Sequence, residues 1–160
     1  MVRTDTPDRQ QLIDLLHVFV RVTNGHDAQS LGLCIADQYR QHNPYAAQDL
    51  SGVIDYFVMM FTAFPDMHAE LLDVMVDGDV ISARCRVRGT HQADFLGFAA
   101  TGRQFEIITV DYFRYRDGLF VEHWDVISVL ELLVQLGVSP HESQQFLSTA
   151  KLNPSEEEEK

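Results

Sequence analysis

Near the start of the chain, apolar residues recur at the three- and four-residue spacing of an amphipathic helix over positions 12–22. Thr6 is a suitable N-cap for this helix, and Pro7 suits its first turn, where a missing N–H costs nothing. The pair Asn24-Gly25 is a typical end signal. The pattern therefore predicts an opening helix that ends at these two residues.

The next segments are shorter and less regular. A second helix is predicted over about 28–37, followed by an extended segment over 39–43, because the residue before Pro44 avoids helical geometry. Apolar residues at helical spacing predict a third helix from about residue 51 to 64, before Pro65. Three helices thus precede the rest of the chain.

From residue 67 onward the pattern changes to the alternation that is typical of strands. Strands are predicted over 67–76, 80–91 and 103–115, and another follows the turn at 116–118. Residues 126–137 return to a short helix, which Gly137 ends. Helices followed by a mainly antiparallel sheet predict an α+β fold.

The turn between the last two strands decides which side chains they share. A two-residue turn would place Asp111 beside Trp124. A three-residue turn, with Gly118 in the left-handed position of a bulge, would place Asp111 opposite His123, with Asp125 one step further along. We expect the second register.

In that register one face of the hairpin gathers two carboxylates and an imidazole among apolar neighbours. Its members are Thr109, Asp111, Phe113, His123, Asp125 and Ile127. The opposite face carries Tyr112 and Trp124, which are too large and apolar to leave in water lightly. We therefore expect the first face to be a site and the second to be the interface of a homodimer.

Composition limits the possible classes of protein. The chain has 160 residues, 46% of them apolar, which suits a single domain over 1–138 with a largely disordered tail over 139–160. The formal net charge of −12 argues against nucleic acid and anionic membranes as partners. No signal peptide or membrane span is expected. Cys34 and Cys85 are expected to be buried, reduced thiols, which suits a cytoplasmic protein.

Further candidates for the site come from histidines and from the third helix. His42 and His91 lie at the ends of extended segments, and Phe57 and Phe61 lie on the stripe of the helix that would cover the sheet. With Phe113 and Ile127 they are the residues expected to contact a substrate. A metal site is conceivable from His42, His91, His123 and Asp125, but no pair has the short spacing of zinc motifs. We expect neither a metal nor a cofactor.

Three longer motifs carry a resemblance to a known family. They are GTHQADFLGFAATGR (89–103), DYFRYRDGLFVEHWDV (111–126) and LLVQLG (132–137), with FPD (64–66) before the first strand of the sheet. The chain resembles the SnoaL-like polyketide cyclases, which have the fold of nuclear transport factor two and ketosteroid isomerase. The resemblance implies a cone-shaped, cystatin-like α+β barrel, in which a curved and mainly antiparallel sheet wraps around N-terminal helices.

The resemblance also implies a chemistry. Such cyclases close a ring by an intramolecular aldol reaction, using an acidic residue on the last strand and no metal; Asp125 is the matching position here. Asp111 stands where relatives often have a histidine, and His123 supplies the imidazole instead. Relatives often carry an acid where this chain has Ser128, and an epoxide hydrolase would want an arginine at Thr109.

Elementary chemistry leads to the same residues. A carbon next to a carbonyl loses a proton only if a base is placed beside it and the enolate oxygen is stabilised. Asp111, His123 and Asp125 are therefore the expected catalytic residues of a cyclase or isomerase acting on a hydrophobic carbonyl compound. The alternative is a module of the same fold that binds a small ligand or forms dimers without chemistry.

Overall fold

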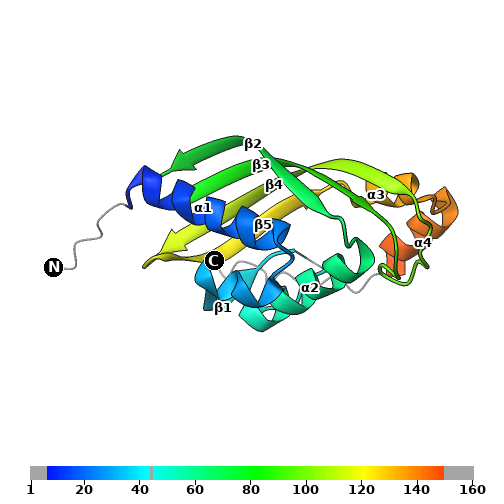
Figure 1. The fold of residues 1–160 in the computed structure, drawn as a ribbon, viewed down its shortest axis with the longest axis horizontal. Helices are drawn as coiled ribbons and strands as arrows, with labels where there is room; N and C mark the ends of the chain where they lie inside the picture. Colours follow the sequence, from blue (N-terminus) through cyan, green and yellow to red (C-terminus); the bar gives the residue numbers. More distant parts are fainter. Residues whose placement is uncertain (1–6, 44, 150–160) are drawn as a thin grey trace.

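The computed structural model describes residues 7–43 and 45–149 (Figure 1). Their elements, in chain order, are α1 (Arg9–Asn24), the 3-10 helix η1 (Ala28–Leu33), β1 (Ile35–Gln41), α2 (Asp49–Ala63), β2 (His68–Asp77), β3 (Val80–Thr90), β4 (Gln104–Arg116), β5 (Leu119–Ile127), α3 (Val129–Leu136) and α4 (Pro140–Thr149). The expected α+β class is confirmed.

The strands form one sheet with the order β1-β5-β4-β3-β2, in which β1 runs parallel to β5 and all other neighbours are antiparallel. The sheet is curved but not closed, so the barrel is open between β1 and β2. Figure 1 shows α1 crossing the sheet and α3 and α4 together at one end. The main core lies between the sheet and α1, α2 and η1, and includes Leu12, Leu16, Ile81, Phe113 and Phe120.

Two local predictions in the N-terminal part need correction. The N-cap of α1 is Asp8, whose side chain accepts from the backbone while Gln11 bonds back to Asp8 in a capping box. Thr6, the expected cap, lies outside the described residues. The expected helix over 28–37 is only the 3-10 helix η1, because β1 begins at Ile35, where it pairs with Phe120 of β5. Pairing with the sheet outweighs the local helical signal.

The hairpin has the expected faces but a different register. The turn has two residues, Asp117 and Gly118, both with positive φ (50° and 92°), as a type I′ turn requires. The bulge lies inside β5 instead, at Val121, because Tyr115 pairs with Phe120 while Arg114 pairs with Glu122. Compared with the expected hairpin, the turn is one residue shorter and β5 contains one extra residue at the bulge. The two changes cancel, so the same side chains share the cavity face.

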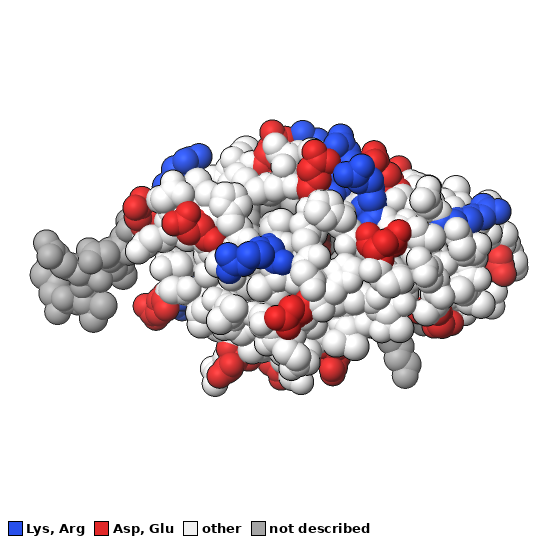
Figure 2. All heavy atoms as spheres, viewed as in Figure 1, with Lys and Arg blue, Asp and Glu red and all other residues white. Residues whose placement is uncertain are grey.

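The outer surface of β2 and β3 carries cross-strand ion pairs. Arg86 contacts Glu70 at 2.8 Å and Glu106 at 3.4 Å, and Arg84 pairs with Asp73. Figure 2 shows basic and acidic side chains side by side along the upper edge, over these strands. This arrangement leaves little unpaired positive charge there to attract an anion.

Within the segment predicted as a tail, residues 140–149 form the helix α4. The helix α4 buries Ser143 and places Phe146 against Tyr45 and Phe98, at ring distances of 6.1 and 5.6 Å. Residues 150–160 of the expected tail lie outside the described part. Among the described helices, none has the length and apolar character needed to cross a bilayer.

Candidate active site

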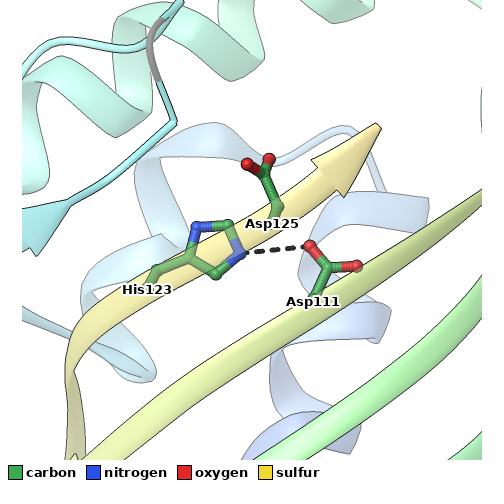
Figure 3. A group of neighbouring side chains, drawn as sticks. All are labelled: Asp111, His123 and Asp125. Carbon is green, nitrogen blue, oxygen red and sulfur yellow. Dashed lines mark hydrogen bonds and ion pairs between the residues drawn. The ribbon is translucent and has the colours of Figure 1, made fainter. Parts of the chain in front are cut away.

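Three polar side chains point to the same side of the sheet at its centre (Figure 3). Asp111 of β4 is paired directly with Asp125 of β5, and His123 lies two residues before Asp125 on the same face. Phe113 of β4 pairs with His123 of β5 on this face and is fully buried. A shift of one residue would move Phe113 to the outer face, so its burial holds the register. The three residues therefore come together because of strand alternation and the bulge at Val121.

These side chains line a cavity of about 130 Å³ between the sheet and helices α1 and α2. Most of its wall is apolar and includes Leu16, Phe19, Val53, Phe57, Ile107, Phe113, Ile127 and Leu132. Its polar side chains are concentrated near Asp125 and include Tyr39, Gln41, Asn43, Tyr56, Asp111 and His123. A mostly apolar cavity with a few convergent polar groups is typical of a small-molecule site.

A second, more open hollow of about 760 Å³ adjoins this cavity. The two share Asn43, Tyr45, Asp125, Ile127 and Val129 as lining residues. We call this second hollow the outer groove. Its other lining residues belong to α3, α4 and the end of β5, among them Val126, Leu130, Val134 and Leu147. Asp125 thus faces both the interior cavity and the outer groove.

Both nitrogens of the His123 ring have polar partners. Nε2 lies 3.1 Å from Oδ1 of Asp111, and Nδ1 lies 3.0 Å from Oε1 of Gln41. The ring is stacked on Phe113, with centroids 4.4 Å apart. Asp111 in turn accepts a hydrogen bond of 3.1 Å from the Thr109 hydroxyl. The imidazole is therefore held in a fixed orientation.

Asp125 has a neutral hydrogen-bond partner. Nδ2 of Asn43 donates to Oδ2 of Asp125 at 2.5 Å, and Oδ1 of Asn43 accepts from the backbone N–H of Tyr45 at 2.8 Å. Among the described residues, no arginine or lysine forms an ion pair with this carboxylate. Burial raises the pKa of Asp125 most, and the nearby charge of Asp111 raises it further, while His123 and the Asn43 hydrogen bond act against them.

Two tyrosines near the carboxylates remain protonated phenols. Burial raises the pKa of Tyr39 well above its ordinary value, and the charges of Asp111 and Asp125 add to the effect. The pKa of Tyr56 is raised for the same reasons. The site therefore combines a carboxylate of raised pKa with neutral O–H donors.

The three side chains also satisfy one condition for a metal site. Asp111, His123 and Asp125 each present a possible ligand atom within 4.8 Å of the others. However, both ring nitrogens of His123, both oxygens of Asp111 and one oxygen of Asp125 already have protein hydrogen-bond partners. A metal ion would have to displace most of this network, so the residues fit a hydrogen-bonded site better than a metal centre.

Comparison with known proteins now adds the family. The sequence profile of the SnoaL-like polyketide cyclases matches residues 13–136. The chain belongs to this family. A comparison with curated proteins found no match.

Solved structures of proteins with similar sequences have the same fold. TsrD from Streptomyces laurentii is 32% identical with a TM-score of 0.78, over 83% of this chain and 99% of that one. IdmH from Streptomyces antibioticus, proposed to be a polyketide cyclase, is 32% identical with a TM-score of 0.70, over 79% and 98%. AclR from Streptomyces galilaeus, proposed to be a hydroxylase, is 28% identical with a TM-score of 0.75, over 83% and 100%.

The expected substrate-contacting residues are only partly brought together. Phe57, Phe113 and Ile127 line the cavity. Phe61 is not among its lining residues and instead stacks on His26, with ring centroids 4.5 Å apart. Phe57 on α2 thus faces the cavity, whereas Phe61 packs against His26.

His42 and His91 are not part of this SnoaL-like site. His42 lies on the outer face of the sheet, stacked on Trp124 at 4.5 Å and hydrogen-bonded to Glu122 at 2.9 Å. His91 is fully buried beside Phe64, and its Nδ1 lies 3.1 Å from the Thr101 hydroxyl. Burial lowers the pKa of His91. The conceivable metal set that used both histidines is therefore not assembled.

Sequence reasoning missed Gln41 and Asn43, although it predicted their extended segment. Alternation along 39–43 places Tyr39, Gln41 and Asn43 toward the cavity and His42 away from it. The alternation groups these three side chains on one face, but it does not show that this face reaches the carboxylates. Histidine is the residue type most often found in acid/base catalysis, so His42 was predicted instead. It lies between Gln41 and Asn43 in the chain, but its side chain faces away from the carboxylates.

Proposed function

We propose that this SnoaL-like protein is a cofactor-independent enzyme of the cyclase or isomerase type, acting on a hydrophobic, carbonyl-bearing small molecule. The observation that carries the proposal is Asp125. It is a carboxylate with a raised pKa at an apolar cavity, held by the amide of Asn43 rather than by a cation. Such a group is suited to move a proton to and from carbon.

The proton path can be written from the residues present. The Asp125 carboxylate takes a proton from the carbon beside a carbonyl, and the electron pair of the broken C–H bond forms an enolate. The phenols of Tyr39 and Tyr56 both line the cavity and supply O–H donors for the enolate oxygen. In an isomerisation, Asp125 returns the proton to another carbon. In an aldol cyclisation, the enolate carbon attacks a second carbonyl of the same molecule, and the new alkoxide takes the proton back.

The two hollows suggest the shape of the substrate. An interior cavity of about 130 Å³ has room for roughly one ring, since a cavity of about 150 Å³ holds benzene. Any larger part of the molecule would lie in the outer groove, which shares Asp125 and Asn43 with the cavity. We therefore propose a substrate whose reacting carbon lies at the junction of a buried apolar end and a more exposed end. A homodimer and a cytoplasmic location stay predictions.

The test uses a panel of hydrophobic ketones from one to three rings, with β-tetralone as the two-ring member, in deuterium oxide. Deuterium uptake beside the carbonyl is followed by proton NMR, and binding by saturation transfer in the same samples. Enzyme-dependent uptake supports acid/base chemistry. Binding without uptake by any member would instead favour the non-catalytic ligand-binding module, and the proposed function would be wrong.

A further inference from the structure

The orientation of the Gln41 side chain is fixed by the backbone. Its Oε1 atom accepts a hydrogen bond of 2.9 Å from the backbone N–H of Asn43. A backbone N–H can only donate, so the oxygen of the Gln41 amide, and not its NH₂ group, must stand at this position. The backbone of Gln41 is itself held by both ends of the Gln48 amide, at 3.1 and 2.6 Å.

The same oxygen determines the proton of the imidazole. Oε1 of Gln41 lies 3.0 Å from Nδ1 of His123, and an amide oxygen can only accept. Nδ1 of His123 must therefore carry a hydrogen. The parallel pairing of β1 with β5 holds the two residues opposite each other, with Gln41 and His123 as register partners. His42 N–H also donates to the His123 carbonyl at 3.0 Å.

With Nδ1 protonated, the contact on the other side of the ring needs a second proton. Nε2 of His123 lies 3.1 Å from Oδ1 of Asp111, and a bare nitrogen facing a carboxylate oxygen would set two lone pairs against each other. The proton sits either on Nε2, beside an ionised Asp111, or on Asp111, beside a neutral ring. In both forms the His123–Asp111 pair has no net charge.

We propose that Gln41 is a positioning residue that fixes His123 with a hydrogen on Nδ1, so that the His123–Asp111 pair holds one shared proton and Asp125 alone carries the net negative charge of the site. The hydrogen on Nδ1 of His123 follows from the hydrogen bonds of the Gln41 oxygen. The catalytic consequence is that Asp125 remains the base, and this part rests on the proposed function.

The other titratable groups around the imidazole do not change this net charge of the site. Asp111 on β4 and Asp125 on β5 are the acids that face it, and Tyr39 of β1 is stacked near it with ring centroids 6.3 Å apart. Tyr56 of α2 and Cys85 of β3 lie further along the same cavity. Burial raises the pKa of all three of these last groups, so they stay neutral.

Removing the Gln41 oxygen should allow the neutral imidazole that carries a hydrogen on Nε2 and none on Nδ1. In a Gln41→Leu variant, Nδ1 of His123 can release its hydrogen to solvent, while the shared proton stays on Nε2 and is donated to an ionised Asp111. The pair would then carry a charge of −1, and two like charges would face each other across β4 and β5. That repulsion raises the pKa of Asp125. The acid limb of the pH–rate profile should therefore move to higher pH.

The decisive experiment needs no substrate. Proton–nitrogen correlation NMR across about pH 5 to 9 reports whether each imidazole nitrogen carries a hydrogen, and a His123→Asn variant assigns the signals. The wild-type protein is expected to show a hydrogen on Nδ1 of His123 at neutral pH. Gln41→Leu should show a bare Nδ1 above neutrality, whereas Gln41→Glu, which keeps an oxygen there, should retain the wild-type signal.

Each outcome bears on the proposal. A bare Nδ1 in the wild-type protein at neutral pH overturns it, and so does a protonated Nδ1 that persists in the folded Gln41→Leu variant. The wild-type measurement stands even if that variant fails to fold. The pH profile of deuterium uptake by β-tetralone adds a second readout, in which a merely structural role would lower the rate without moving the acid limb. The expected NMR signals together with no uptake would disprove only the proposed function.

Discussion

Asp111 and Asp125 are directly paired across β4 and β5, on the cavity face of the sheet. Opposed side chains in antiparallel strands have Cβ atoms about 5 Å apart, so two ionised carboxylates here would repel each other strongly. In the protonation state proposed above, His123, hydrogen-bonded to Asp111, offsets one of the two charges. The arrangement places two chemically identical groups in different surroundings, and Asp125 lies where the cavity meets the outer groove.

The raised pKa of Asp125 predicts a gain in stability when its charge is removed. Because its folded-state pKa lies above the ordinary value of 3.8, the folded state binds the proton more tightly than the unfolded state. Ionisation therefore destabilises the fold as pH rises through the raised pKa. Asp125→Asn should have a higher Tm than the wild type at pH 7, and the difference should vanish as pH falls below the ordinary value. An equal or lower Tm at pH 7 would contradict the assigned burial of this charge.

The Asn43 amide should set the pH at which Asp125 becomes an effective base. Its hydrogen bond to the ionised form holds the pKa of Asp125 down. Losing this hydrogen bond should raise the pKa of Asp125, so Asn43→Leu should move the acid limb of the pH profile of deuterium uptake to higher pH. Asn43→Asp should move the acid limb further still, because it adds a carboxylate. Unshifted profiles in both variants would show that Asn43 does not act on Asp125.

Both thiols should be unreactive in the folded protein. Burial raises the pKa of Cys34 and of Cys85 to about 12 each, so almost no thiolate exists at neutral pH. Ellman's reagent is expected to label neither residue until denaturant is added, and then to label both of the chain's two cysteines. Rapid labelling without denaturant would mean that η1 or β3 opens locally.

The homodimer predicted from the hairpin remains to be tested on its outer face. Val110, Tyr112 and Val126 lie on that face with exposed fractions of 37, 41 and 70%. We expect a dimer in sedimentation at micromolar concentration and a monomer for Val110→Lys. Val58→Lys on α2, where the valine is 46% exposed, is the matched control and should leave the dimer intact. A monomeric wild-type protein would rule the interface out.

Much of the fold could be predicted because strand alternation is a local property. The cavity face of the hairpin was predicted correctly from a period of two, even though its register was wrong. The bulge at Val121 has no residue signature, since any side chain can occupy it. The strand β1 was missed in part because its burial does not alternate regularly and its pairing with β5 is a contact between distant parts of the chain.

The site was less predictable than the fold. Asp111, His123 and Asp125 could be placed together because they share two adjacent strands. The amides of Gln41 and Asn43 reach the site only through the pairing of β1 with β5, which no short-range pattern shows. Residue type was a poor guide here, since His42 lies one position away and faces outward.

The central claim is that Asp125 moves the proton in this SnoaL-like cavity. Its most direct test is the rate of deuterium uptake by β-tetralone, or by whichever panel ketone binds, for Asp125→Asn against the wild type. The amide keeps the shape of the carboxylate but cannot accept the proton, so uptake should fall by about 10²-fold or more while saturation transfer shows that the ketone still binds. Uptake within a few-fold of the wild-type rate would contradict the claim.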